Sequence, residues 1–162
     1  MYARPRPSKK KIKKMHNKIE ILPATPAHVQ DIHAIEVLSF SLPWSQDAIL
    51  SEVNNIHSVC LVAISDGNVI GYISLRHIVN EGHISNIAVL PSWRGNGVGM
   101  ALLAATTNIA IALEMIGLTL EVRISNAPAI SLYKRHGFIV EGNMKNYYSH
   151  PTEDAVIMWK YF

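Results

Sequence analysis

The chain has 162 residues, 49% of them hydrophobic, which fits one ordinary globular domain with a sizeable core. No apolar run reaches the ~18–20 residues of a membrane span, so no membrane association is expected. The one cysteine, Cys60, excludes an intramolecular disulfide and cysteine-based zinc motifs. It lies in an apolar stretch, which predicts a buried, unreactive thiol. Without disulfides or a secretory signal, the chain is expected to be cytoplasmic.

The net charge of +3 is unevenly distributed along the chain. Residues 1–18 hold eight basic residues and no acidic ones, whereas residues 19–162 hold seven basic and twelve acidic residues, a net charge of −5. With two prolines and no apolar periodicity, residues 1–18 are predicted to be a disordered basic tail. A solvated extension is the simpler interpretation of this tail. Contact with the ribosome or RNA is the alternative, because each phosphate contact releases a counterion.

The first part of the predicted domain contains a strand and two helices. Residues 19–22 predict a short strand, and Thr25-Pro26 predicts the start of a helix that runs to residue 38. The apolar spacing places four side chains of that helix on its buried face: Val29, Ile32, Ile35 and Leu38. Ser45 is the expected N-cap of a second, short helix that ends near residue 53.

The remaining elements predict a sheet covered by helices. Residues 58–65 and 68–78 flank Asp66-Gly67, the signal of a hairpin, and residues 83–90 form a third strand. A long helix is expected from Val98 to residue 116, with Gly117 as its stop, followed by a strand over 118–124. A helix over 128–136, capped by Asn126, and strands over 138–145 and 155–161 complete the chain. About seven strands and four helices over residues 19–162 predict one α/β domain with a mixed sheet.

The turn from Arg94 to Gly99 has three glycines between a strand and a helix, which is anion-binding geometry. Glycines let the backbone approach a phosphate closely, and the first N–H groups of the helix point at it. A P-loop is excluded because Met100 follows the last glycine, and the glycine spacing excludes a dinucleotide fingerprint. Considered alone, the turn predicts only an anion at a helix start.

Further segments make the pattern specific. Arg94, Gly97 and Gly99 resemble the R/Q-x-x-G-x-G/A signature of the GNAT superfamily of acetyl-CoA-dependent acetyltransferases. Residues 120–138 resemble the E-V-R-x-S-N-x-x-A-I-x-L-Y-x-x-x-G-F run of its branch that acetylates protein N-termini, which includes ribosomal-protein-alanine and archaeal N-alpha-acetyltransferases. Residues 42–44, 85–89, 146–148 and 153–155 resemble four more of its segments. The resemblance covers residues 19–162 and implies the GNAT fold, a mostly antiparallel, twisted central sheet.

The resemblance also implies where acetyl-CoA binds. The pyrophosphate would lie on residues 94–100, the pantetheine arm would pair with the backbone of residues 87–89, and the N–H of Val89 would bind the thioester oxygen. The cofactor-binding residues implied in this way are Ile87, Ala88, Val89, Arg94, Gly95, Asn96, Gly97, Val98, Gly99, Met100, Asn126 and Tyr133. No metal is expected, because no two histidines have the spacing of metal ligands.

The catalytic roles follow from the same resemblance. It assigns the general base to Glu121, although a glutamate near pKa ~4.3 and an amine near ~8 differ by roughly 5 kcal/mol. His83, with an ordinary pKa near ~6.5, is the second candidate, and ordered water is the third. Tyr133 is the implied acid for the departing CoA thiolate. We expect loss of Tyr133 to slow the reaction without abolishing it.

The acceptor is expected between two loops, Leu42-Pro43-Trp44 and Tyr147-Tyr148, where relatives hold a peptide N-terminus. Aromatic hydroxyls around an extended backbone suit recognition through main-chain hydrogen bonds. The predicted reaction is acetylation of protein or peptide N-termini by direct attack in a ternary complex. Two alternatives stay open: acetylation of lysine side chains or small amines, which the acidic body favours, and a non-catalytic acyl-CoA-binding regulator.

Overall fold

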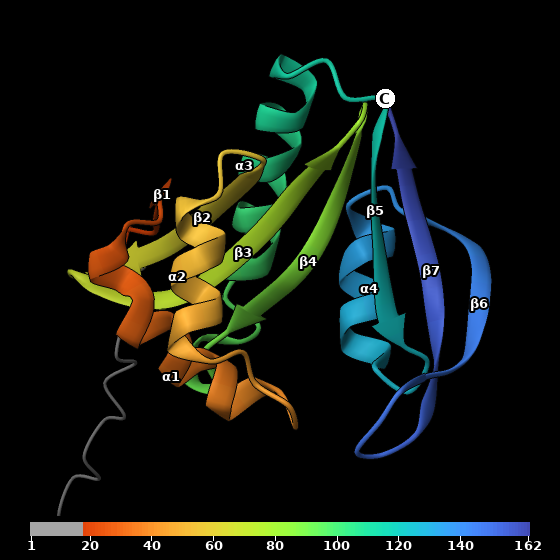
Figure 1. The fold of residues 1–162 in the computed structure, drawn as a ribbon, viewed down its shortest axis with the longest axis horizontal. Coiled ribbons are helices and arrows are strands. Elements are labelled where there is room, and N and C mark those ends of the chain that lie inside the picture. Colours follow the sequence, from red (N-terminus) through yellow and green to blue (C-terminus); the bar gives the residue numbers. More distant parts are fainter. Residues whose placement is uncertain (1–17) are drawn as a thin grey trace, which may run out of the picture.

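The computed structural model describes residues 18–162 and contains a seven-stranded sheet in the order β1-β2-β3-β4-β5-β7-β6 (Figure 1). Neighbouring strands run antiparallel except β4 and β5, which run parallel. This is the mixed, mostly antiparallel α/β sheet that the sequence predicts. In chain order the elements are β1 (Glu20–Pro23), the 3-10 turn η1 (Pro26–His28), α1 (Val29–Ser39), α2 (Gln46–Asn54), β2 (Ser58–Ser65), β3 (Asn68–Ile78), β4 (Glu81–Val89), η2 (Pro91–Trp93), α3 (Val98–Ala112), β5 (Gly117–Arg123), α4 (Ala127–Arg135), β6 (Ile139–Tyr148) and β7 (Glu153–Tyr161).

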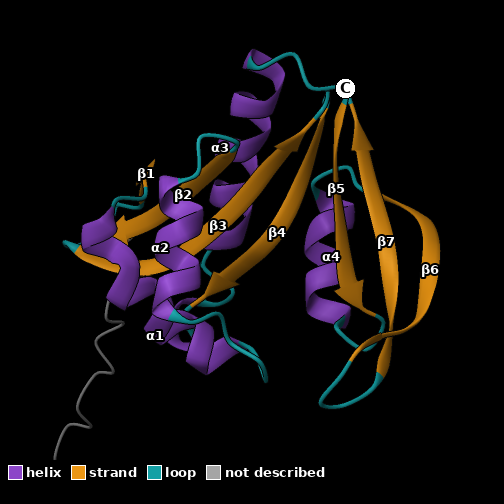
Figure 2. Ribbon diagram, in the orientation of Figure 1, coloured by secondary structure: helices purple, strands orange, loops and turns teal. Residues whose placement is uncertain are grey.

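Helices cover both faces of the sheet (Figure 2). On one face, α1 and α2 bury Ile32, Ile35 and Ile49 against Tyr72 and Ala88 of the sheet. On the other face lies the larger core cluster, to which α3 and α4 contribute Leu102, Leu103 and Tyr133 and β5 contributes Leu118, Leu120 and Val122. The sheet is therefore the middle of three layers.

The sheet is nearly divided between β4 and β5. The two strands pair only at Gly82–Leu118 and His83–Thr119, and they diverge beyond these pairs (Figure 1). Gly82 lies at the apex of the resulting V, where an added Cβ would lie 2.6 Å from Cδ2 of Leu118 and 2.9 Å from Sδ of Met115. A register shift against β3 leaves Ser85 as a bulge in β4 just past the apex. The divergence opens the sheet toward the carboxyl ends of both strands.

Several local predictions are confirmed. The hydroxyl of Ser45 accepts a hydrogen bond from the N–H of Ala48 and caps α2, and Oδ1 of Asn126 accepts one from Ala129 at the start of α4. The β2–β3 hairpin turns at Asp66-Gly67. Thr25-Pro26 does begin a helical segment, although its first turn is the 3-10 turn η1.

The predicted end of the long helix is wrong. α3 ends at Ala112, four residues before the expected last helical residue, because Glu114 adopts a left-handed conformation with φ of 59° that an α-helix does not allow. Gly117 is instead the first residue of β5. An added Cβ there would lie 2.6 Å from the carbonyl oxygen of Lys160 in β7, so this glycine permits close strand pairing.

The predicted buried face of α1 is wrong at its last position. Leu38 is 60% exposed, and the fourth buried residue of the helix is Glu36. The helical period explains the error, since Glu36 follows Ile32 by four residues and shares its face, whereas Leu38 follows by six. A carboxylate therefore occupies a position that an apolar pattern would fill.

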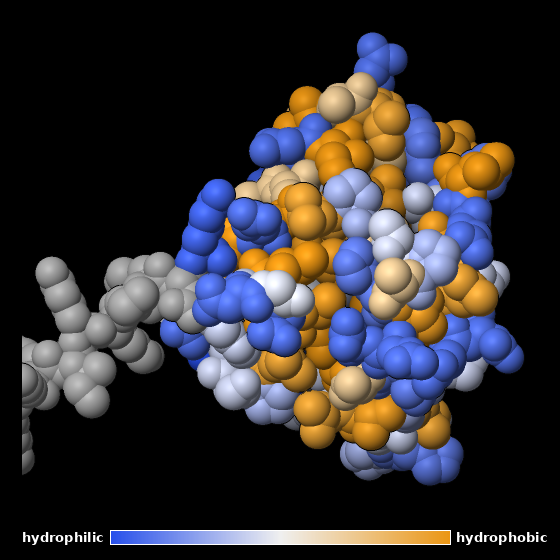
Figure 3. Space-filling view, turned by 90° about the vertical axis from the view of Figure 1, so that its left-hand side faces the viewer, coloured by the Kyte–Doolittle hydropathy of each residue, from blue (hydrophilic) through white to orange (hydrophobic). Residues whose placement is uncertain are grey.

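The surface near the β1 edge shows hydrophilic and hydrophobic side chains intermixed (Figure 3). Among residues 18–162, no helix is both long enough and apolar enough to cross a membrane. The prediction of a basic tail falls on residues outside the described part, apart from Lys18, whose ammonium lies 3.2 Å from the carboxylate of Glu20.

Candidate active site

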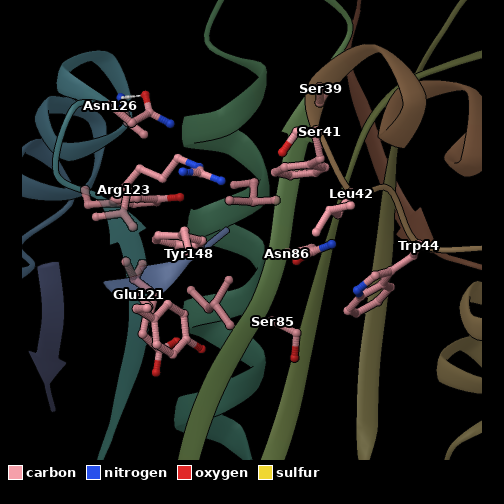
Figure 4. Close-up of a pocket in the computed structure, with 18 of the residues that line it drawn as sticks. Ser39, Ser41, Leu42, Trp44, Ser85, Asn86, Glu121, Arg123, Asn126 and Tyr148 are labelled. Carbon is pink, nitrogen blue, oxygen red and sulfur yellow. Dashed lines mark hydrogen bonds between the residues drawn. The ribbon is translucent and has the colours of Figure 1, made fainter. Parts of the chain in front are cut away.

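A cleft of about 660 Å³ occupies the opening between β4 and β5. Figure 4 shows the residues that line it in two groups, with the loop before α2 on one side, β5 and the β6–β7 hairpin on the other, and β4 between them. From the predicted set, the lining includes His83, Ile87, Glu121, Asn126, Tyr133, Leu42, Trp44, Tyr147 and Tyr148. The fold thus brings together predicted residues from five separate segments.

His83 and Glu121, the two candidate bases, face each other at the bottom of the cleft. Nε2 of His83 lies 2.6 Å from Oε2 of Glu121, and the two side chains are 28% and 21% exposed. Strand alternation produces this placement, because Leu120 and Val122 point into the core and leave Glu121 on the opposite face of β5. The sequence offered the two residues as alternatives, whereas the structure makes them a hydrogen-bonded pair.

The backbone of β4 has hydrogen-bonding groups directed at the opening. The N–H of Leu90 donates to Ile70 of β3, so by strand alternation the N–H of Ala88 faces β3 and those of Ile87 and Val89 face the other way. The pairing between β4 and β5 has already ended at His83. Two of the three predicted pantetheine-binding residues thus present N–H groups on the side where β5 has diverged, and Ala88 does not.

The glycine-rich turn continues from β4 into α3. Gly95 and Gly97 have φ of 74° and 81°, and Gly97 is the N-cap of the helix. The hydrogen bond from the N–H of Ala101 to Gly97 is the first of the helix, so the preceding N–H groups, including those of Gly99 and Met100, have no intrahelical acceptor. Arg94 donates from Nε to the carbonyl of Val89 at 3.2 Å, and Asn96 donates to Trp93 and Arg94. The free N–H groups at the start of α3 fit a pyrophosphate.

Tyr133 and Asn126 come from either end of α4. Tyr133 is buried in the core beside Phe138, and burial raises the pKa of its phenol well above its ordinary value of about 10. The phenol is therefore a neutral donor at any physiological pH. Asn126 is exposed and lines the cleft while its side chain caps the helix.

The two predicted acceptor loops lie on opposite sides of the cleft. Leu42 and Trp44 line one side, and Pro43 between them is exposed but is not among the lining residues. The rings of Tyr147 and Tyr148 meet edge to face, with centroids 5.0 Å apart, on the other side. Burial, followed by the neighbouring Tyr147, raises the pKa of Tyr148 to about 12.

The sequence did not identify three residues that shape this cleft. Arg123 places its guanidinium carbon 4.5 Å from the ring centre of Tyr148 and donates to the carbonyls of Ser149 and Pro151. Glu36 and Asn86 form a hydrogen bond on the opposite side. The available signal for Glu36 was a carboxylate on the apolar face of a predicted helix, where burial is costly without donors.

The comparison with known families follows this geometry. The family model described as Acetyltransferase (GNAT) family matches residues 29–138, which is most of the chain. The chain therefore belongs to the GNAT family of acetyltransferases, as the resemblance of its motifs implied.

Individual relatives agree with this assignment. The ribosomal protein bS18-alanine N-acetyltransferase of Salmonella typhimurium is 33% identical over 148 residues, which are 88% of this chain and 95% of the relative. An N-alpha-acetyltransferase of Sulfurisphaera tokodaii is 39% identical over 110 residues, 60% of this chain and 65% of the relative. The crystal structure of the ribosomal-protein-S18-alanine N-acetyltransferase of Escherichia coli matches with a TM-score of 0.81 at 28% identity, over 88% of this chain and 92% of that one.

Proposed function

We propose that this enzyme transfers the acetyl group of acetyl-CoA to the N-terminal α-amine of proteins. The observation that carries the proposal is the His83–Glu121 pair, which lies in a cleft shared by the candidate acetyl-CoA strand and both acceptor loops. The named activities of the bacterial and archaeal relatives support the choice of acceptor.

In the proposed reaction the neutral amine attacks the thioester carbonyl carbon, an N–C bond forms, and the C–S bond breaks with CoA leaving as a thiolate. The N–H of Val89 stabilises the negative charge that develops on the carbonyl oxygen. The amine loses one proton in all, and the thiolate accepts one. No other reactant is needed for this balance.

The proton from the amine passes to the His83–Glu121 pair. Imidazole is intrinsically a stronger base than a carboxylate and is therefore better suited to accept a proton from an amine. The carboxylate oxygen Oε2 of Glu121, 2.6 Å from Nε2 of His83, holds the imidazole ring and stabilises the imidazolium that forms when the ring accepts the proton. The two residues therefore act as one base, directly or through a water molecule between His83 and the amine.

The thiolate is stabilised by the phenol of Tyr133. Burial raises its pKa, which makes full proton transfer to a thiolate near ~8.5 unfavourable. A hydrogen bond from the neutral phenol to sulfur is sufficient for this role, and the proton is then taken from solvent.

An assay with short peptides tests the proposal. The protein is incubated with acetyl-CoA and peptides that begin with alanine, serine or methionine, each with a free or a blocked N-terminus and an internal lysine. Mass spectrometry should find one acetyl group on the N-terminal residue of the free peptides. Acetylation of the internal lysine in free and blocked peptides alike would instead support the lysine alternative, and tight CoA binding without acetylation of any peptide would support the small-amine or the regulator alternative.

The basic tail, residues 1–18, is proposed to hold the enzyme near ribosomal RNA. Its eight basic residues suit this role, because affinity for RNA increases with the number of phosphates neutralised. Removal of residues 1–17 should abolish salt-dependent binding to ribosomes in a pelleting assay while kcat for short peptides stays the same. Equal ribosome binding by the two proteins would leave the tail as a solvated extension.

A further inference from the structure

Glu36 is a buried acidic residue behind the cleft lining, and the proposed chemistry does not use it. Its side chain is 0% exposed, and it accepts hydrogen bonds from three donors. Oε2 accepts the backbone N–H of Trp44 at 2.8 Å, and Oε1 accepts the amide nitrogen of Asn86 at 2.7 Å and the hydroxyl of Tyr72. A buried carboxylate is costly unless donors surround it, and these three hydrogen bonds offset that cost.

The donors to Glu36 connect two parts of the cleft lining. Trp44 belongs to the loop before α2, and Asn86 belongs to β4, immediately before Ile87 on the candidate acetyl-CoA strand. The carbonyl of Trp44 is held as well, 2.9 Å from Nδ1 of His33. The backbone of Trp44 is thus fixed at both its N–H and its carbonyl by side chains of α1.

The charge on Glu36 also fixes how Asn86 is oriented. An ionised carboxylate only accepts hydrogen bonds, so the Asn86 amide must present its nitrogen to Glu36. Its carbonyl oxygen then lies on the opposite side of the amide group. Because Asn86 lines the cleft between its two walls (Figure 4), this oxygen is an acceptor available to a molecule bound there.

We propose that Glu36 is a positioning residue for the acceptor, which acts by directing the carbonyl oxygen of Asn86 at the incoming amine and by holding Trp44 in place. The peptide N-terminus offers donors here, the N–H groups of its α-amine and of its first peptide bond, so an oriented carbonyl oxygen suits it and leaves the amine lone pair free for attack. This inference rests on the proposed acetylation of peptide N-termini.

Glu52 provides a matched control. It lies on α2, is 4% exposed, and its carboxylate accepts from Arg76, Ser58 and Ser74. Neither Glu52 nor any of these partners lines the cleft. Substitution of either glutamate removes a buried, hydrogen-bonded carboxylate, but only Glu36 contacts residues of the candidate acceptor site.

The test compares Glu36→Gln, Glu52→Gln and Asn86→Ala in steady-state kinetics with an N-terminal alanine peptide. Glu36→Gln should raise KM for the peptide about tenfold. The new side-chain amide carries N–H groups, which cannot accept a hydrogen bond from one of the three donors, so the Asn86 carbonyl is no longer fixed. KM for acetyl-CoA should stay within about twofold. Glu52→Gln should leave both KM values near wild type, even where it lowers Tm.

Asn86→Ala removes the oriented oxygen directly and should raise peptide KM as much as Glu36→Gln does. In the double variant the two effects should not add, because Glu36 acts in part through Asn86. If Glu36→Gln does not fold, Asn86→Ala decides: an unchanged peptide KM overturns the inference. A rise in peptide KM for Glu36→Gln no larger than that for Glu52→Gln overturns it as well.

Failure of the proposed function gives a different result. It is seen with the wild-type enzyme, which would then leave free peptide N-termini unmodified. If the wild type acetylates lysine side chains instead, KM for the lysine substrate is compared between Glu36→Gln and Glu52→Gln. The role of Glu36 is then decided by whether its variant shows the larger rise.

Discussion

The two candidate acceptor loops are held against the cleft by opposite means. On one side a fully buried anion, Glu36, accepts from the backbone of Trp44. On the other side a cation, Arg123, whose side chain is 24% exposed, covers Tyr148 and donates to the carbonyls of Ser149 and Pro151. Salt and solvent weaken the interactions of an exposed charge far more than those of a buried one.

This difference indicates that the two walls of the cleft, the loop before α2 (the Trp44 wall) and the β6–β7 hairpin (the Tyr148 wall), differ in how readily they move. The Trp44 wall is fixed before the acceptor binds, because its anion cannot exchange its donors for water without exposing the core. The Tyr148 wall can adjust to the acceptor more readily, because the side chain of Arg123 is partly exposed and water can reach it. Variants that disturb each wall separately should therefore have effects of different size.

The largest effect is expected at the His83–Glu121 pair, at the bottom of the cleft. Glu121→Gln removes the carboxylate that holds His83 and should lower kcat at least about tenfold, as loss of a general base does. Acetyl-CoA affinity, measured by calorimetry, should not change. Wild-type turnover in this variant would assign the base to His83 alone or to water.

A smaller effect is expected from Tyr133, the proposed hydrogen-bond donor to the CoA thiolate. Tyr133→Phe should lower kcat about fivefold to tenfold, since a hydrogen bond to the leaving thiolate is lost but the thiolate is itself a stable leaving group. Single-turnover measurements with saturating acetyl-CoA would show this. A loss above about a hundredfold would mean that proton transfer from Tyr133 is required.

The adjustable wall should respond weakly. Arg123→Lys keeps the charge but loses the planar contact with Tyr148 and the paired donors, so peptide KM should rise about threefold. The comparison with the tenfold rise expected for Glu36→Gln measures the difference between the walls. Equal rises for the two variants would contradict it.

The smallest effect concerns the buried tyrosine behind each wall. Burial raises the pKa of Tyr72, with Glu36 adding to the shift, and burial raises that of Tyr133. Both phenols stay neutral in the fold while the unfolded chain ionises near pH ~10, so this contribution to stability is complete below pH ~10 and is lost as pH rises further. Denaturant unfolding at pH 8 and pH 11 should show the loss. The loss should be smaller in Tyr72→Phe, and an equal loss there would contradict the assignment.

The sequence correctly predicted the features of the fold that depend only on a few neighbouring residues. Caps at Ser45 and Asn126 and the turn at Asp66-Gly67 need only their immediate neighbours, and all three are found. The end of α3 was mispredicted because Gly117 was interpreted by its neighbours in sequence, whereas its contact is with Lys160, far along the chain.

The site was predicted as a set of residues but not as a geometry. Motifs named Glu121 and His83, yet their contact depends on the parallel pairing of β4 with β5, which no short pattern encodes. Glu36 was missed for a related reason. Its role depends on three donors from α2's preceding loop, β3 and β4, and a helical pattern shows only that the position is buried.

Gly82 gives the cleft a mechanical property. It stands in the first of the two residue pairs that join β4 to β5. From His83, in the second pair, β4 extends about 20 Å to Val89 at roughly 3.3 Å per residue. Because this part of β4 is long, a side chain at position 82 that moved β4 and β5 apart by a fraction of an ångström would separate them several times as far near Val89. The close approach of the two halves of the sheet at the apex, from which the cleft opens, therefore depends on a residue without a side chain.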